Sequence, residues 1–342
     1  MSSPERRMEV LRRQLLAAPA AGPFPPPPAS RTASPRTSTG DDVVIVSALR
    51  TPVCKARRGA LAGCTPDHLL ATVLRETLTR TGLDPTIIND IVVGNVLSPG
   101  GGAVMARVAQ LLAGIPHTVP LTSVNRQCSS GLQAVASVAA AIKSGLYEVG
   151  IAAGVESMSQ DPMGDVMPSI NLETAAASPA ARDALVTMGI TSENVAERFG
   201  ITREAQDAFA AVSHAKAAFA QSQGHFTGEI VAVECPGNNG KAPTMVSADD
   251  GIRPQTTPEA LAGLKAAFKE GGSTTAGNSS QTSDGAAAVL MMKRSTAARL
   301  GLPVLAAFRS FTVVGVPPAI MGIGPAFAVP GTEKGSTPSF PS

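Results

Sequence analysis

The sequence has very few aromatic residues and no long apolar segment. Tryptophan is absent, tyrosine occurs once, and aromatic residues make up 3% of the 342 positions. Helices and sheets therefore have to pack closely through small side chains, chiefly alanine and glycine. No apolar run approaches the roughly 20 residues that cross a bilayer, so we expect no membrane span.

Charged residues are also scarce, and the two signs nearly balance. They form 16% of the chain and leave a net charge of +2, whereas 44% of the residues are hydrophobic. This balance lacks the excess of basic residues that is typical of nucleic-acid or membrane-surface binding, so we expect neither partner. The apolar fraction over this length is enough for a sizeable core and for two domains.

The four cysteines have no spacing typical of a metal site or a disulfide framework. Cys54, Cys64, Cys128 and Cys235 include no Cys-x-x-Cys pair, and we expect no secretory signal at the start of the chain. These observations predict a reducing compartment rather than structural disulfides.

From residue 42 onward, apolar strands and amphipathic helices alternate. Strands are predicted at 43–46, 87–93, 150–155 and 286–292, and helices at 65–81, 105–112, 192–199 and 203–223. We expect Thr191 to cap the helix at 192–199. Continuous apolar strands that alternate with helices indicate an α/β layered domain whose sheet is largely buried.

One segment, residues 123–142, carries no charge after Arg126. A helix that starts near Ser129 would have small or apolar residues all round, which predicts burial on every face. Cys128 would lie at its N-terminus, where free N–H groups and the helix dipole favour the nucleophilic thiolate. Most free cysteines are inert buried residues, so the pattern alone leaves both interpretations open.

The segment 125–134, Asn-Arg-Gln-Cys-Ser-Ser-Gly-Leu-Gln-Ala, closely resembles the nucleophile motif of the thiolase family, and especially of the peroxisomal 3-ketoacyl-CoA thiolases. Further similar segments are 50–52, 94–97, 154–159, 188–196, 275–280 and 321–325, and they follow the family's order. The resemblance covers about residues 42–330.

The resemblance implies a thiolase-like layered α-β-α-β-α fold. Its first domain would comprise 41–159 and 275–299, with residues 160–274 inserted as a loop domain over the CoA site. Residues 300–330 would be a remnant of a largely missing second domain, and 331–342 a divergent tail without helical period. The family resemblance also implies a homodimer.

The implied chemistry is acyl transfer between a 3-ketoacyl-CoA and CoA in fatty-acid β-oxidation, with Cys128 forming an acyl-thioester. Met188, Ala276 and Ser280 would contact the acyl and pantetheine chain, and Arg253 a CoA phosphate. Coenzyme A is then a substrate, and no bound cofactor or metal is expected.

The family also uses an acid/base His, a second Cys and an Asn, found in Gly-His-Pro, Cys-x-Gly and Asn-Glu-Ala-Phe motifs of its second domain. We expect this chain to lack the His and Cys motifs, so that it has little or no activity. Two interpretations stay open: an acyltransferase, or a truncated non-catalytic isoform that only binds CoA or dimerises. A hydrolase that pairs a cysteine with His117 has no supporting motif.

Residues 1–40 are rich in Arg, Ala and Pro, with four consecutive prolines, and are predicted to lie outside the folded core. Within them, residues 7–15 resemble an N-terminal (type 2) peroxisomal targeting signal, although Met8 departs from its usual second residue. The resemblance implies a peroxisomal import receptor as partner. A mitochondrial presequence is the alternative, which four nearby arginines favour and Glu5 and Glu9 oppose.

Overall fold

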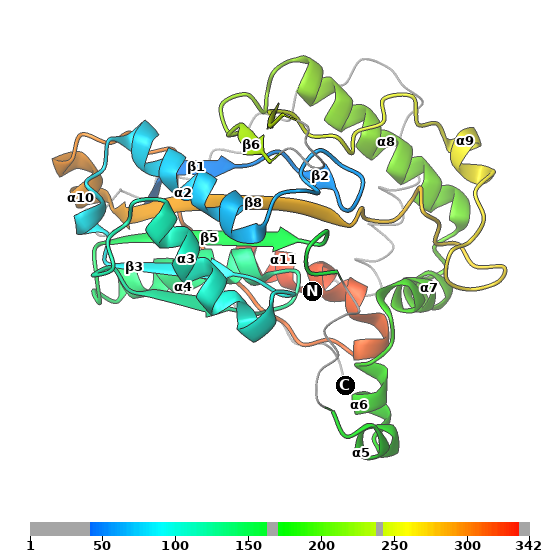
Figure 1. Cartoon of the computed structure of the whole chain (residues 1–342). Helices are drawn as coiled ribbons and strands as arrows, with labels where there is room; N and C mark the ends of the chain where they lie inside the picture. Colours follow the sequence, from blue (N-terminus) through cyan, green and yellow to red (C-terminus); the bar gives the residue numbers. More distant parts are fainter. Residues whose placement is uncertain (1–41, 163–169, 237–241, 335–342) are drawn as a thin grey trace.

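One mixed β-sheet organises the part of the chain that the computed structural model describes, residues 42–162, 170–236 and 242–334 (Figure 1). Its strands are β1 (Val43–Arg50), β2 (Cys54–Lys55), β3 (Asp90–Gly94), β4 (Leu121–Val124), β5 (Val149–Ser157), β8 (Ser283–Lys293) and β9 (Ala306–Ala307). All four predicted strands are present. The second starts at Asp90 rather than at residue 87, because Pro85–Ile87 form a 3-10 turn (η1).

The spatial order of the strands is β4-β3-β5-β8-β1-β9, with the short β2 beside β8. β3 runs parallel to β4 and β5, whereas β8 is antiparallel to both β5 and β1. Met292 of β8 thus faces Val149 on one side and Val44 on the other. β8 therefore lies between β5 and β1 at the centre of the sheet, although it comes after both in the sequence.

Helices cover the two faces of the sheet. α2 (Pro66–Thr81) and α3 (Ala103–Leu112) lie on one face, where Leu70 and Leu74 share a core with Ile151 and Leu290. α4 (Ser130–Lys143) lies on the other, packed against alternate strand residues such as Met291. The predicted bounds of α2 hold because Pro66 starts the helix and Gly82 ends it in the left-handed conformation.

The prediction that α4 is buried on every face is wrong. Ala134, Val138 and Ile142 pack on the sheet, but Leu132 on the same helix is 58% exposed. An apolar composition all round shows only that a helix could be covered on every side. Within the described residues, one sheet packs on α4, so its opposite face stays open.

The segment between β5 and β8 forms a second, largely helical region (Figure 1). It contains α5 (Leu172–Ala177), α6 (Pro179–Asp183), α7 (Met188–Phe199), α8 (Arg203–Ser222), β6 (Val233–Cys235), β7 (Thr244–Val246) and α9 (Pro258–Ala262). The two predicted helices are confirmed as α7 and α8. The predicted cap is wrong, because α7 already begins after Thr187 and Thr191 is buried within it.

A disulfide joins Cys64 to Cys235, with an S–S distance of 2.08 Å and a Cα–Cα distance of 5.7 Å. It connects the loop before α2 to β6, across a separation of 171 residues. The prediction that the chain has no structural disulfide is therefore wrong. Short-range spacing carries no signal for partners this far apart.

Beyond β8 the chain forms α10 (Arg294–Arg299), β9, a 3-10 segment η3 (Pro318–Ile323) and α11 (Gly324–Lys334). β9 pairs with β1 and so extends the same sheet. Ile320, Ile323 and Phe327 form a small core against Val195 and Phe199 of α7. α11 continues to Lys334, so the expectation of no helical structure from residue 331 onward is wrong for its first four residues.

The expected targeting segment, residues 7–15, lies outside the described residues. Among the helices that the structure describes, none is long and apolar enough to cross a membrane.

Candidate active site

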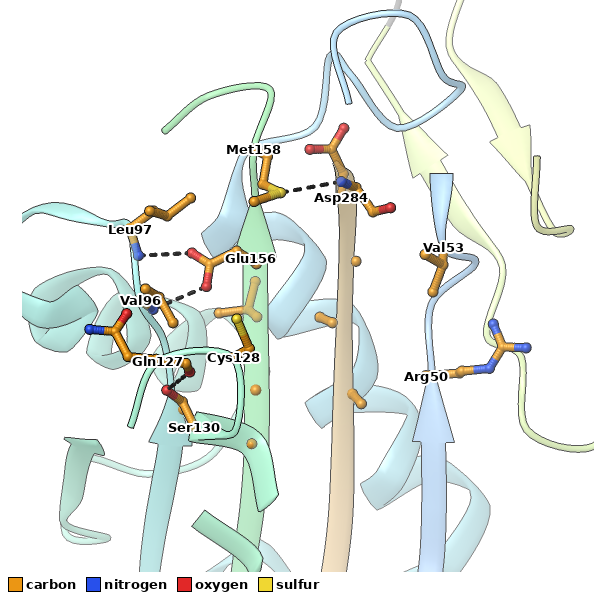
Figure 2. A pocket seen from close by; sticks show the side chains of 18 of the residues that line it. Arg50, Val53, Val96, Leu97, Gln127, Cys128, Ser130, Glu156, Met158 and Asp284 are labelled. Carbon is orange, nitrogen blue, oxygen red and sulfur yellow. Dashed lines mark hydrogen bonds between the residues drawn. The ribbon is translucent and has the colours of Figure 1, made fainter. Parts of the chain in front are cut away.

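A pocket of about 530 Å³ opens where β3, β5 and β8 meet the start of α4 (Figure 2). Its wall is mainly apolar side chains and bare main chain, including Gly94, Gly154 and Ala286. A volume in this range is typical of small-molecule sites. Cys128 and Met188, which are 60 positions apart in the sequence, both line it.

Cys128 lies on a tight turn directly before α4. Gln127 adopts a left-handed conformation with φ of 49°, which is uncommon for a residue other than glycine. The buried Ser130 holds this turn, because its Oγ accepts the Arg126 N–H at 2.9 Å and donates to the Gln127 carbonyl at 2.5 Å. The Cys128 side chain is exposed toward the pocket (Figure 2), so of the two interpretations that the sequence left open, the inert buried cysteine does not apply.

Two carboxylates that the sequence analysis did not single out also line the pocket. Burial raises the pKa of Glu156, although hydrogen bonds from the Leu97 and Val96 amides oppose this effect. Asp284 is fully buried and accepts hydrogen bonds from the Ser159 N–H at 2.9 Å and the Ser159 hydroxyl at 2.5 Å. Both carboxylates thus accept hydrogen bonds from neighbouring main-chain or hydroxyl groups.

Arg50, the cation of the pocket wall, is paired as well. Its guanidinium donates to Asp249 at 2.7 Å and to Glu229 at 2.7 Å, and it lies 5.3 Å from the centre of the Phe226 ring. These partners belong to the segment between β5 and β8, so the pairing holds that segment to the end of β1. A signal for these residues did exist, because each lies at one end of an apolar strand in a matched or adjoining segment. Arg50 and Glu156 lie at the ends of β1 and β5, and Asp284 lies at the start of β8.

Met188 is the first residue of α7, and its side chain is 43% exposed at the pocket. The ring of Phe268 lies directly over the next residue, Gly189, where any Cβ would collide with it. A larger residue at this position would have to displace the exposed Phe268 ring.

The other predicted site residues lie outside the pocket wall. Ala276 and Ser280 are exposed in the loop that leads into β8. Arg253 is also exposed, and its main-chain N–H donates to His214 Nδ1 at 3.2 Å. Their assignment to CoA binding stays a prediction.

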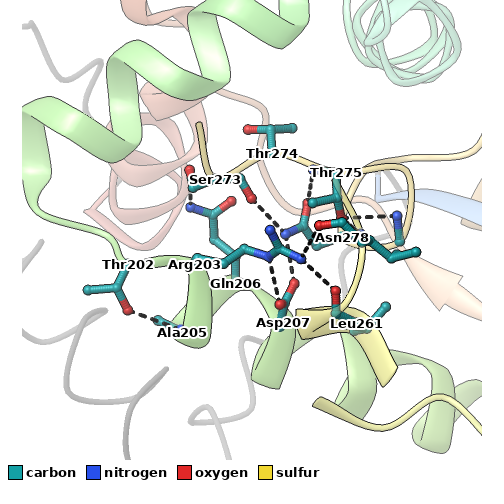
Figure 3. Close-up of polar contacts among 12 residues, drawn as sticks. Thr202, Arg203, Ala205, Gln206, Asp207, Leu261, Ser273, Thr274, Thr275 and Asn278 are labelled. Atoms are coloured by element: carbon teal, nitrogen blue, oxygen red, sulfur yellow. Dashed lines mark hydrogen bonds and ion pairs between the residues drawn. The ribbon is translucent and has the colours of Figure 1, made fainter. Parts of the chain in front are cut away.

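A polar network fixes the loop that carries Ala276 (Figure 3). Arg203 and the buried Asp207 of α8 form an ion pair at 2.7 Å, and Asp207 accepts a hydrogen bond from Asn278 at 2.9 Å. Arg203 also donates to the Leu261 carbonyl at 2.5 Å. The loop therefore has a defined position relative to α8 and α9 before it enters β8.

No histidine lines the pocket among the residues that the structure describes. His68 bonds the Glu234 carbonyl at 2.8 Å, and the His117 carbonyl accepts from Arg107. The sequence contains neither Gly-His-Pro nor Asn-Glu-Ala-Phe. Contrary to the expectation, it does contain one Cys-x-Gly, at 235–237. Cys235 forms the disulfide with Cys64, so it offers no free thiol for acid/base chemistry.

Within the described ranges, no group of three His, Cys, Asp or Glu side chains is arranged to hold a metal ion. The arrangement instead combines one accessible thiol with a pocket whose wall is mainly apolar. Such a site is suited to covalent transfer of an acyl group.

Comparison with known proteins relates the chain to one family throughout. The family model for the thiolase N-terminal domain matches residues 43–295. The peroxisomal 3-ketoacyl-CoA thiolase A of Rattus norvegicus is 56% identical over 319 residues, which cover 92% of this chain and 70% of that protein.

Two solved structures of the same family are also similar to this chain. The dimeric peroxisomal thiolase of Saccharomyces cerevisiae matches with a TM-score of 0.82 and 42% identity, over 87% of this chain and 76% of that one. Peroxisomal 3-ketoacyl-CoA thiolase of the same yeast, described as a five-layered α-β-α-β-α structure of two core domains, has a TM-score of 0.71 at 36% identity, over 88% and 74%.

Proposed function

Because this chain belongs to the thiolase family, and so has the thiolase-like layered fold predicted for it, we propose that it acts as a 3-ketoacyl-CoA thiolase in fatty-acid β-oxidation. The observation that carries the proposal is the placement of Cys128. Its turn presents a thiol to an apolar pocket, within the segment that resembles the family's nucleophile motif.

The proposed reaction has two halves. The Cys128 thiolate attacks the 3-keto carbon, the bond between C2 and C3 breaks, and the departing acetyl-CoA carbanion takes up a proton at C2. Coenzyme A then gives up its thiol proton and attacks the acyl group on Cys128. This second step releases the shortened acyl-CoA and restores the thiolate.

Residues of the chain have distinct proposed roles in these steps. Met188 would pack against the acyl chain, since it lines the same pocket as Cys128. Ala276 and Ser280 would contact the pantetheine arm from the fixed loop before β8, and Arg253 a CoA phosphate. Coenzyme A is a substrate in this scheme, and the proposal requires no metal.

Proton transfer is the weak point of the chain's chemistry. Glu156 and Asp284 are already hydrogen-bonded, and no histidine stands among the described residues of the pocket wall. General acid/base groups contribute about 10²–10⁴-fold to such reactions. We therefore expect turnover by the 342-residue chain to be slow while acylation of Cys128 still occurs.

The acyl-enzyme is the intermediate to look for. The purified chain is incubated with acetyl-CoA, and its peptides are searched for an added acetyl group on Cys128. Cys128→Ser serves as the inactive variant and Cys54→Ala as the cysteine control. Acetylation of Cys128 that is lost in Cys128→Ser and kept in Cys54→Ala supports the proposal, whereas an unmodified Cys128 contradicts it.

A non-catalytic CoA-binding chain is the second candidate, and the absence of Gly-His-Pro from the sequence favours it. Thiolysis of acetoacetyl-CoA by the same protein, beside calorimetric titration with CoA, separates the two. Binding of CoA without acylation or Cys128-dependent cleavage would select this candidate.

We further propose a peroxisomal location, an import receptor that binds residues 7–15, and a homodimer. The relatives named peroxisomal support the location, and the dimeric thiolase of Saccharomyces cerevisiae supports the homodimer.

A reporter fused to residues 1–40 and its Arg7→Ala variant test the targeting role of this segment. Mitochondrial or diffuse fluorescence that Arg7→Ala leaves unchanged would refute it. The domain bounds given above are part of the same proposal.

A further inference from the structure

The carboxylate of Glu156, at the end of β5, is bonded entirely to the loop that follows β3. Its Oε2 accepts the Val96 N–H at 3.0 Å and its Oε1 accepts the Leu97 N–H at 3.0 Å (Figure 2). Oε1 also accepts the Asn95 side-chain amide at 3.2 Å. Three donors thus converge on one side chain, which is partly buried in the pocket wall.

The same loop is linked to the turn that carries Cys128. The Val96 carbonyl accepts a hydrogen bond from Asn125 Nδ2 at 3.4 Å, and Asn125 Oδ1 accepts the Gln127 N–H at 2.9 Å. Gln127 is the left-handed residue directly before Cys128. A continuous series of hydrogen bonds therefore runs from Glu156 through Val96 and Asn125 to the main chain beside the thiol.

We propose that Glu156 is a positioning residue for Cys128, which it holds in the attacking orientation through Val96 and Asn125. The inference rests on the proposed function for its effect on catalysis. The coupling itself, from a carboxylate on β5 to the turn before α4, can be measured without any turnover.

A carboxylate suits this role better than any neutral side chain. Adjacent N–H groups at Val96 and Leu97 require an acceptor on each oxygen, and an ionised carboxylate has acceptors only. Glutamine at position 156 would turn an NH₂ group toward one of these donors. Hydrogen bonds to a charged acceptor are also stronger than neutral ones, so Gln cannot fully replace Glu here.

The remaining polar groups near this loop have their own partners. Asp161 accepts from the Ser98 hydroxyl at 2.7 Å, and the Asn95 side chain also donates to the Val155 carbonyl at 2.9 Å. Asp284 bonds Ser157 and Ser159 instead, on the opposite side of the β5 end. Asp284→Asn is therefore a matched control, since it removes a charge from the same pocket without touching the series.

The first measurement is hydrogen exchange of a peptide that spans residues 125–130. We expect Glu156→Gln to accelerate exchange there, because the Val96 loop no longer holds Asn125, and Asp284→Asn to leave it at the wild-type rate. Equal exchange in wild type and Glu156→Gln would overturn the coupling, whether or not the protein is a thiolase.

The second measurement is the rate of Cys128 acylation by acetyl-CoA at saturating and subsaturating concentrations. A small displacement of a reacting group costs up to about a hundredfold, so we expect Glu156→Gln to slow the maximal rate by about tenfold or more. The half-saturating concentration should change less than twofold, to within about 0.4 kcal/mol. A raised half-saturating concentration at an unchanged maximal rate would overturn the positioning role.

If Glu156→Gln fails to fold, Asn125→Asp tests the same inference. It retains the acceptor for Gln127 and replaces the donor to Val96 with a carboxylate oxygen, which adds a negative charge at an exposed position. We expect the same loss of acylation rate, and no further loss when both substitutions are combined, since they cut one series. The inference would be refuted if Asn125→Asp is acylated at the wild-type rate, or if the fold-losses of acylation rate in the two single variants multiply in the double variant. If the wild type is not acylated but hydrogen exchange is altered in Glu156→Gln, the proposed function is refuted and the coupling between Glu156 and the Cys128 turn stands.

Discussion

The main chain of Ser130 lies against Gly94, so closely that a Cβ on Gly94 would stand 2.6 Å from the Ser130 carbonyl oxygen and 2.5 Å from the next amide nitrogen. The first turn of α4 thus rests directly on the end of β3. This approach brings the turn that carries Cys128 to the wall of the pocket.

Gly94→Ala should therefore be strongly destabilising. The new methyl group meets the rigid peptide group between Ser130 and Gly131, and overpacking of this kind costs typically about 1–3 kcal/mol. Gly131→Ala is the matched control, because no atom lies within 4 Å of a Cβ there and alanine favours the helix by up to about 1 kcal/mol. Urea unfolding should shift in opposite directions, and a common direction would contradict the packing described.

Cys128 should be the first cysteine to react with iodoacetamide. It is exposed, whereas Cys54 is buried and has its pKa raised to about 12 by burial and by Asp250. Cys64 and Cys235 are protected by their bond as long as reductant is absent. Peptide mapping after brief labelling tests this order, with Cys128→Ala as the blank. Earlier modification of Cys54 would refute it.

Loss of the Cys64–Cys235 bond should lower stability. A disulfide contributes typically about 2–4 kcal/mol to stability, more for longer closed loops, and this one closes a separation of 171 residues. Calorimetry with and without dithiothreitol should show a lower melting temperature in the reduced protein. The double variant Cys64→Ser/Cys235→Ser should melt near the reduced value and not respond to dithiothreitol. A response in that variant would assign the effect to another cause.

Glu193 should contribute to stability in a pH-dependent way. Burial alone would raise its pKa, but hydrogen bonds from the Ser273 and Thr274 amides outweigh burial and lower the pKa below its ordinary value of 4.5. The ionised carboxylate thus stabilises the folded chain at neutral pH. This contribution is lost as the pH falls from about 4.5 through the lower folded-state pKa.

Glu193→Gln should accordingly melt at a lower temperature than the wild type at pH 7, and the difference should shrink below about pH 4. Melting curves of both proteins from pH 7 to pH 3 measure this change. A difference that stays constant over the whole range would show that the charge of Glu193 plays no part.

The sequence predicted the secondary structure best where local patterns decide it. The helical spacing of Leu69, Leu70, Val73 and Leu74, behind Pro66 and before Gly82, predicted α2 almost to the residue. The central strands β5 and β8 were equally clear, since both are continuous apolar runs. The segment around Cys128 also predicted the start of α4 to within one residue.

The features that the sequence did not predict depend on residues far apart in the chain. Nothing local distinguishes Cys64 and Cys235 as partners, and their pairing follows from the way β6 lies beside the loop before α2. Glu156 is likewise an ordinary polar residue at a strand end until the loop after β3 comes within reach of its carboxylate. The exposed face of α4 was missed because composition shows what can be buried and not what covers it.

The position of β8 has a consequence for how the protein is made. β8 separates β1 from β5, and Val43 at the start of β1 pairs with Lys293 at the end of β8. On a ribosome, β1 emerges long before its neighbour in the sheet, so its two hydrogen-bonding edges wait unpaired through most of translation. At a synthesis rate of about 5–20 residues per second, an apolar strand with unpaired edges stays exposed for tens of seconds, and chaperone capture during synthesis is the natural protection.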